Sequence, residues 1–222
     1  MRRTQRPSRA IESVTHLNRK WDASVYEPAA RSALAHFPVA EEDAELISHS
    51  ENVTFRVADQ GSIYSLRLHR PGYNSIGELN SERAWTAALA EEGLNVPRSL
   101  LTRQGNHFAT IAIPGVAAEC YAGMTTWIEG EPLSNYLDAH SGRNERLRFF
   151  HRIGEIAATI HNQSTRWAAP RGFERPRLDL DGLVGETPRW GRFWEHPDLT
   201  GAERDLMFRA RNRLRETLRE YG

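Results

Sequence analysis

Apolar and polar residues alternate through much of the segment from residue 44 to residue 128. Five runs in this segment have the spacing of β-strands: 44–50, 53–58, 62–70, 107–113 and 118–128. Residues 76–91, between the third and fourth runs, have the spacing of a helix. Asn74 or Ser75 can cap the start of this helix, and Gly93 its end. The pattern predicts a small α+β lobe of five strands with one inserted helix.

Helical spacing prevails outside this segment. The pattern predicts helices at 28–37, 133–140, 144–163 and 201–220. Apolar residues form one stripe on the third of these helices: Leu147, Phe150, Ile153, Ala157 and Ile160. His161 falls on the same stripe, where a hydrogen-bonded core histidine is expected. Residues 164–199 are rich in Pro, Gly, Trp and Arg, and we expect them to form a long irregular excursion.

The composition fits one large domain or two small lobes, since 39% of the 222 residues are hydrophobic and 26% are charged. No apolar run approaches the ~18 residues of a transmembrane helix, so no membrane partner is expected. Because the net charge is zero, the overall charge gives no reason to expect binding to nucleic acid or to membranes. The single cysteine, Cys120, cannot form an internal disulfide, and we expect it to be a buried, inert thiol. A reducing, cytoplasmic location fits best.

The first twenty residues are strongly basic. They contain six cationic residues and one acidic residue, Glu12: the cations are Arg2, Arg3, Arg6, Arg9, Arg19 and Lys20. No apolar core follows, which excludes a secretory signal peptide. An Arg-rich, acid-poor start is typical of a transit peptide or of a solvated arm, and the second interpretation is favoured. Residues 1–25 are therefore predicted to be a basic, disordered arm.

One cation and one carboxylate in the 50–92 segment have the spacing of a functional pair. In the strand 62–70, Leu66 and Leu68 share one face and Arg67 points to the other. In the helix 76–91, Glu82 falls on the same stripe as several apolar residues. A carboxylate that faces the protein needs a partner, and Arg67 is the candidate. Spacing alone leaves two alternatives open, a phosphate-holding pair and a structural ion pair without a ligand.

Several stretches resemble the aminoglycoside phosphotransferase-like kinases, most closely the bacterial branch that includes a stress-response Ser/Thr protein kinase. They are ENVTFRV, YSLRLHRPGY, SERAWTAALAEEGLNVP, TTWIEGEPL and the region from HNQSTRW through GFERPRLDLDGLVGETPRWGRFW. The resemblance implies a protein-kinase-like fold, with a five-stranded antiparallel N-lobe and the first helices of a mainly α C-lobe. It places the nucleotide lobe at 26–123, the hinge at 124–131 and a partial C-lobe at 132–222, with ATP between the lobes.

The resemblance also implies roles for seven residues. Arg67 takes the place of the phosphate-binding strand lysine, and Glu82 that of its partner on the helix. Asn52 and Thr54 belong to the turn that covers the phosphates, which contains no glycine here. Their side chains and the backbone N–H groups of the turn would make the phosphate contacts. Three hinge residues would read adenine through their backbone: Thr126, Trp127 and Ile128. The alternative for these three is an ordinary buried edge strand.

The catalytic parts of the family are not found in this sequence. Phosphoryl transfer needs an aspartate and oxygen ligands for Mg²⁺, and in the family these follow the helix that here ends at 220–222. The sequence His196-Pro197-Asp198 imitates the H-x-D motif, but Glu203 stands where asparagine is required, and Thr200 with Glu203 reads as a capping box. Asp179 and Asp181 are expected to form a turn with Asx hydrogen bonds, not a metal site. No catalytic or metal-binding residue is assigned.

The sequence therefore predicts the N-terminal part of an ATP-dependent phosphotransferase that binds ATP but does not turn over, with Mg²⁺ required only in a full-length form. The phosphate acceptor is unknown. The alternative is a non-catalytic, pseudokinase-like protein that binds a partner through its Arg-rich arm or its Trp/Arg-rich loop. Nucleic-acid binding by that loop is disfavoured. The apolar face of the last helix leads us to expect self-association through exposed C-lobe surface.

Overall fold

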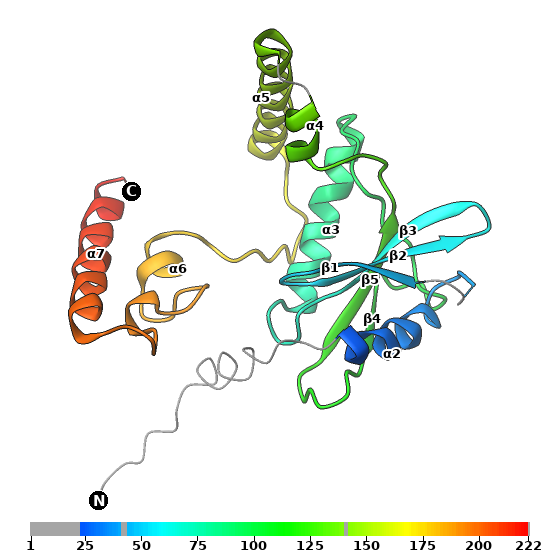
Figure 1. Cartoon of the computed structure of the whole chain (residues 1–222), viewed down its shortest axis with the longest axis horizontal. Coiled ribbons are helices and arrows are strands. Elements are labelled where there is room, and N and C mark those ends of the chain that lie inside the picture. Colours follow the sequence, from blue (N-terminus) through cyan, green and yellow to red (C-terminus); the bar gives the residue numbers. More distant parts are fainter. Residues whose placement is uncertain (1–22, 41–43, 140–141, 222) are drawn as a thin grey trace, which may run out of the picture. The chain divides into compact units, whose positions relative to one another are not determined.

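The computed structural model describes residues 23–40, 44–139 and 142–221 (Figure 1). The chain forms two compact units, and the boundary between them in the sequence falls between Glu174 and Arg175. The sheet unit contains everything described up to Glu174, and the C-terminal unit contains the described residues from Arg175 onward. Most of the predicted basic arm lies outside the described residues, and the lobe boundaries predicted at 123 and 131 stay predictions.

The sheet unit is built on five antiparallel strands in the order β1-β2-β3-β5-β4. Their bounds are β1 Ala44–His49, β2 Val53–Asp59, β3 Ser62–Leu68, β4 Phe108–Ile111 and β5 Cys120–Thr126. The hairpin from β2 to β3 turns through Gln60 and Gly61, whose φ angles of 46° and 81° belong to the left-handed region. Two such residues in succession match the twist of the flanking strands. The five predicted strands and the α+β class are confirmed.

Helix α2 (Ala23–Leu34) covers one face of the sheet (Figure 1). Its alanines allow a close approach, and Leu34 and Phe37 are fully buried against apolar side chains of the strands. The strand side of this core consists mainly of Val53, Phe55, Val57, Leu66, Leu68, Ala122 and Met124. Burying such side chains stabilises each by roughly 1.5–3 kcal/mol. The helix begins and ends earlier than the predicted range of 28–37.

Helix α3 (Ile76–Glu91) is the predicted inserted helix, with the predicted bounds. Ser75 caps its start: its hydroxyl accepts from the Glu78 N–H at 3.0 Å, and the Glu78 carboxylate accepts from the Ser75 N–H at 2.8 Å. Gly93 follows the helix with φ 84°, the conformation that ends many helices. This capping leaves α3 with defined ends although only four of its residues are buried.

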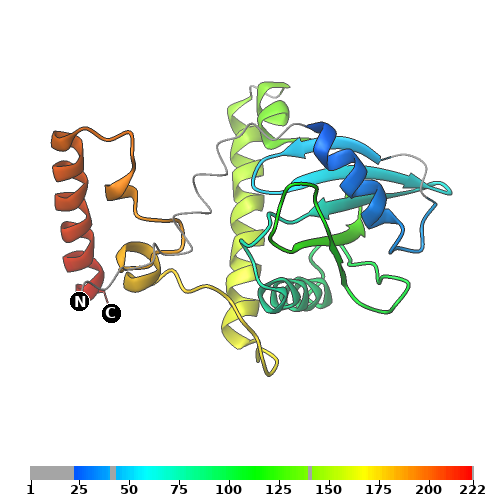
Figure 2. The same cartoon turned by 90° about the horizontal axis from the view of Figure 1, so that it is seen from below.

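Helices α4 (Leu133–Ala139) and α5 (Arg143–Arg166) complete the sheet unit. In Figure 2, α5 is one continuous helix. Its predicted apolar stripe is exposed at Leu147 and Phe150, which are 57% and 53% exposed. His161 is also exposed, so the prediction of a core histidine is wrong. The periodicity identified the helix correctly, but no described residue covers this part of its surface.

The C-terminal unit contains α6 (Leu180–Val184), a short 3-10 helix (Phe193–Glu195) and α7 (Gly201–Glu220). The expected irregular excursion thus contains two short helices. The expected Asx turn is confirmed: the Asp179 carboxylate accepts from the Gly182 N–H at 3.0 Å and caps α6. The predicted capping box of Thr200 and Glu203 is confirmed at the start of α7.

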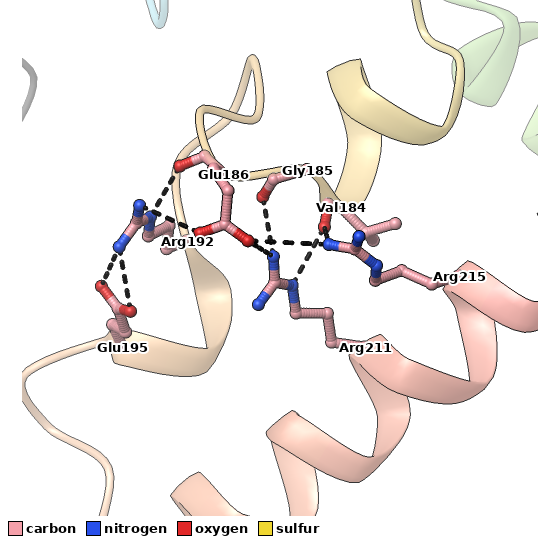
Figure 3. Close-up of polar contacts among 7 residues, drawn as sticks. All are labelled: Val184, Gly185, Glu186, Arg192, Glu195, Arg211 and Arg215. Atoms are coloured by element: carbon pink, nitrogen blue, oxygen red, sulfur yellow. Dashed lines mark hydrogen bonds and ion pairs between the residues drawn. The ribbon is translucent and has the colours of Figure 1, made fainter.

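Arg211 of α7 holds the C-terminal unit together (Figure 3). Its guanidinium donates to the carbonyl oxygens of Val184 and Gly185 at 3.0 and 3.1 Å and to the Glu186 carboxylate at 2.7 Å. The same group stacks on the ring of the buried Trp194, 4.1 Å from its centroid. One buried cation therefore joins α7, the end of α6 and the 3-10 helix.

No helix in the described ranges is long and apolar enough to cross a membrane.

Candidate functional site

A pocket of about 640 Å³ lies between α3 and the face of the sheet that α2 does not cover. Its volume falls within the range of sites for small molecules and cofactors. The strands and their loops contribute Arg67, His69, Pro97, Arg98, Ser99, His107, Phe108, Gly123, Met124 and Thr125. Helix α3 contributes Leu79, Glu82, Arg83, Thr86, Ala87, Ala90 and Glu91. The walls combine apolar surface with several cationic and carboxylate side chains.

The strand arginine and the helix glutamate of the sequence prediction both line this pocket. Arg67 is exposed, opposite Thr54 on β2 and Gly123 on β5 in the strand register. Glu82 is half-buried on α3. The structure therefore brings both side chains to one cavity, where a phosphate could be held between the strand and the helix.

A buried histidine lies next to Arg67 along the same strand face. His69 is 7% exposed, lines the pocket and contacts Phe108 edge-on, with ring centroids 5.7 Å apart. Burial, and secondarily the charge of Arg67, lower the pKa of His69 to about 4. The imidazole is therefore neutral at pH 7 and adds a polar group, not a charge, to the pocket.

A second histidine, His107, also lines the pocket. The Oγ of Ser99 lies 3.0 Å from Nδ1 of His107. Burial, followed by the charge of Arg83, lowers the pKa of His107. The Nε of Arg83 is buried and has no hydrogen-bond partner within the described ranges. Arg83, Ser99 and His107 thus add a cation, a hydroxyl and an imidazole to the lining of the pocket.

The turn before β2 is held by Asn52. The Ser50 N–H donates to the Asn52 carbonyl at 3.0 Å, and the Asn52 Oδ1 accepts from the Arg70 N–H at 3.3 Å. A phosphate accepts hydrogen bonds, so a contact from this side chain would have to come from its Nδ2. Neither Asn52 nor Thr54 is among the residues that line the pocket.

The predicted hinge residues lie at the end of β5, where the sheet uses two of their N–H groups. Thr126 donates its N–H to the Arg98 carbonyl at 2.9 Å, and its hydroxyl accepts from the Arg98 N–H at 3.0 Å. Trp127 donates its N–H to the Ile63 carbonyl at 3.1 Å. Ile128 is 37% exposed, and its backbone makes no hydrogen bond to another described residue. None of the three lines the pocket, although the preceding residue, Thr125, does.

Sequence reasoning missed part of the pocket lining. His69 shares the face of Arg67 by the two-residue period of the strand, which gives its position but indicates no role. Ser99 lies in the connection between α3 and β4, and His107 is the last residue before β4. This connection has neither a helical nor a strand period, so the sequence does not indicate which of its side chains meet. Arg83 directly follows Glu82 in sequence, but its position off the apolar stripe gave no signal.

Comparisons with known proteins identify the family and the fold. Residues 43–220 match the profile of the phosphotransferase enzyme family. The structure of a microcompartment-associated aminopropanol kinase superposes with a TM-score of 0.71 at 30% identity, over 90% of this chain and 58% of that one. An amicoumacin kinase, solved with AMP-PNP, Ca²⁺ and Ami, superposes with a TM-score of 0.61 at 14% identity, over 94% of this chain and 56% of that one. This chain thus spans less than two thirds of either kinase. No curated protein matches the sequence significantly.

Proposed function

Because the chain belongs to the phosphotransferase enzyme family, we propose that its sheet unit binds the nucleotide of an ATP-dependent kinase, with the ATP phosphates at Arg67. The fold is of the protein-kinase-like class, as in the aminoglycoside phosphotransferase-like kinases. One observation carries the proposal: Arg67 and Glu82, singled out from sequence, line a single pocket of suitable size. The sequence pattern and the fold thus both support Arg67 and Glu82 as the residues proposed for the phosphate site.

The chemistry of Arg67 suits phosphate. A guanidinium keeps its charge at all physiological pH values and presents a planar fork of N–H donors, which can bond two phosphate oxygens at once. Glu82, on the facing helix, would orient this fork. Asn52 and Thr54, in the turn and at the start of β2, would contribute the remaining phosphate contacts.

Adenine would lie against the segment that follows β5. Since the sheet already uses the N–H groups of Thr126 and Trp127, the backbone of Ile128 is the part of the hinge that supports hydrogen bonding to a purine edge. The Trp127 carbonyl could accept from the exocyclic amine of adenine. This refines the hinge prediction to the backbone between Trp127 and Ile128.

The proposal assigns no metal ligand and no catalytic aspartate to these residues. No cluster of three or more His, Cys, Asp or Glu side chains suits a metal ion in the described ranges. Asp198 lies before the capping box of α7, with its side chain 89% exposed. The activity proposed for this chain is nucleotide binding.

We prefer nucleotide binding to the alternative of a partner-binding protein, although Trp190 of the Trp/Arg-rich loop is 65% exposed. Most of the Arg-rich arm lies outside the described residues. The Trp/Arg-rich loop is organised by Arg211 and Trp194, which are buried and serve packing.

Titration with ATP, followed by calorimetry and by the thermal unfolding temperature, tests the proposal. Ligand at ten times its Kd should stabilise the fold by about 1.4 kcal/mol. Titration with and without Mg²⁺ separates the contribution of the metal. A chain that shows no stabilisation and no binding heat at millimolar ATP would contradict the proposal.

A further inference from the structure

One side of helix α3 faces the pocket, and another side makes polar contacts with a neighbouring segment of the chain. The pocket lies between α3 and the strands, so the helix lacks a continuous packed interface on the side that carries Glu82. Its buried residues are Leu79, Ser81, Ala88 and Leu89. Successive residues of a helix are 100° apart around its axis, so a rotation of α3 about this axis would change which side chain faces the pocket. With so few buried residues, α3 needs other contacts to fix this rotation.

These contacts come from the end of α5 and the segment after it. The Glu174 N–H donates to the Ser81 hydroxyl at 2.8 Å, and the Ser75 hydroxyl donates to the Glu174 carboxylate at 3.3 Å. The carboxylate thus lies at the N-terminus of α3, where the helix dipole favours a negative charge. Glu174 therefore ties down the first two turns of α3.

The middle and the end of α3 are held in the same way. The Trp85 indole N–H donates to the Gln163 side-chain oxygen at 3.1 Å, and Gln163 is 2% exposed. Arg166, three residues later on α5, pairs with Glu92 just after the end of α3. The buried Gln163 oxygen is costly to leave without its donor, so the Trp85 contact specifies one arrangement, while the exposed Arg166–Glu92 pair adds little energy.

We propose that residues 163–174, the α3 strap, position Glu82 in the nucleotide pocket. Ser81 and Trp85 are four residues apart and lie on one face of α3, and Glu82 lies about 100° around the helix from Ser81. Because the strap holds the face that carries Ser81 and Trp85, it also determines the direction in which Glu82 points. Gln163 and Glu174 are thus positioning residues for phosphate binding at Arg67. This inference rests on the proposed nucleotide-binding function and adds the element that orients its carboxylate.

Gly77 offers a way to displace the strap without weakening the helix. A Cβ on Gly77 would lie 2.2 Å from the Glu174 carboxylate oxygen, so Gly77→Ala must push the carboxylate away from the start of α3. Alanine also raises the helix propensity at this position. If the strap has no influence on the pocket, Gly77→Ala should bind ATP as well as the wild type or better. If the strap positions Glu82, Gly77→Ala should bind ATP more weakly.

The expected result is about a fivefold increase in the Kd for ATP in Gly77→Ala, the size of one lost hydrogen bond. Gly154→Ala in α5 is the matched control, because nothing lies within 4 Å of its added Cβ. That variant should leave the Kd unchanged. Glu174→Ala should weaken ATP binding to a similar extent, and Glu174→Gln, which keeps an acceptor for Ser75, should restore most of the affinity.

A double-variant cycle isolates the contact. In the Glu174→Ala background, Gly77→Ala has no carboxylate to displace and should change the Kd no further. Full additivity of the two substitutions, or an unchanged Kd in Gly77→Ala, would overturn the inference.

Hydrogen exchange separates failure of the strap from failure of the proposed function. Amides of residues 76–91 should exchange faster in Gly77→Ala than in the wild type or in Gly154→Ala, with or without nucleotide. Unchanged protection of α3 would overturn the strap even if ATP binds. If the wild type does not bind ATP, the proposed function fails and the role of the strap in ATP binding fails with it. Faster exchange would then still establish that residues 163–174 hold α3.

Discussion

Gly123 on β5 lies directly opposite Arg67 on β3, and the ring of Phe108 occupies the space that a side chain at position 123 would need. A Cβ there would be 2.8 Å from the ring, closer than real contacts allow. Phe108 is itself paired with Gly123 across the β4–β5 ladder and lines the pocket. Because Gly123 has no side chain, the ring of Phe108 can line the pocket next to Arg67, the arginine proposed to bind phosphate.

Gly123→Ala should displace Phe108 and disturb the pocket beside Arg67. Overpacking of this kind costs about 1–3 kcal/mol of the free energy of unfolding, and ATP binding should weaken as the ring moves. Urea denaturation and ATP titration measure the two effects. Phe108→Leu removes the clashing ring atoms, so the double variant should recover stability relative to Gly123→Ala. A double variant no more stable than Gly123→Ala would show that the ring is not the obstacle.

Arg67→Gln should weaken ATP binding by at least about tenfold, because a charge-assisted contact to phosphate is lost. Arg67→Lys keeps the charge without the fork and should lie between the wild type and Arg67→Gln. Arg148→Gln is the control, since Arg148 is an exposed arginine of α5 outside the pocket. Calorimetric titration gives the three affinities. Equal Kd values for Arg67→Gln and Arg148→Gln would count against phosphate binding at β3.

His69 should make the protein less stable in mild acid. Its folded pKa of about 4 lies below the ordinary value of 6.5. Between these two pH values the unfolded chain binds more protons, so the free energy of unfolding is fully retained above pH 6.5 and falls as the pH drops toward 4. The shift corresponds to about 3 kcal/mol.

Urea denaturation of the wild type and of His69→Leu between pH 4 and pH 7 measures this contribution. The variant should show a shallower loss of stability with falling pH. His107, whose pKa is lowered too, remains in both proteins and cancels in the comparison. Parallel pH profiles for the two proteins would exclude His69 as the source.

Arg211→Met should unfold the C-terminal unit selectively. It removes the donors that satisfy the Val184 and Gly185 carbonyls and the cation that stacks on Trp194. The expected cost is about 2–4 kcal/mol. Arg213→Met on the same helix, whose ion pair with Glu216 at 3.6 Å is exposed, should change stability by less than about 0.5 kcal/mol. Thermal unfolding followed by tryptophan fluorescence distinguishes the two variants, and similar losses for both would contradict the central role of Arg211.

Local patterns predicted the parts of this fold that local interactions determine. The period of two placed Arg67 on the face opposite Leu66. The caps at Ser75 and Thr200 were readable because a capping box needs only residues three apart. The burial of Cys120 followed from its place in an apolar strand.

Features that depend on distant residues could not be predicted in this way. The end of α6 depends on hydrogen bonds from Arg211, 26 and 27 residues later, and the 3-10 helix on stacking of Trp194 against the same guanidinium. The opposition of Arg67 and Gly123 depends on strand register, which no short stretch encodes. The exposure of His161 shows the limit of periodicity, since an apolar stripe identifies a helix but not what covers it.

The core also determines how this protein can be labelled. Cys120 is fully buried in β5, its thiol donates to the His69 carbonyl at 3.1 Å, and burial raises its pKa to about 12. It is the only cysteine in the sequence. Thiol-directed dyes and spin labels therefore have no accessible native target. A cysteine introduced on the surface of α3 or α5 becomes a unique attachment point without any change to the wild-type core.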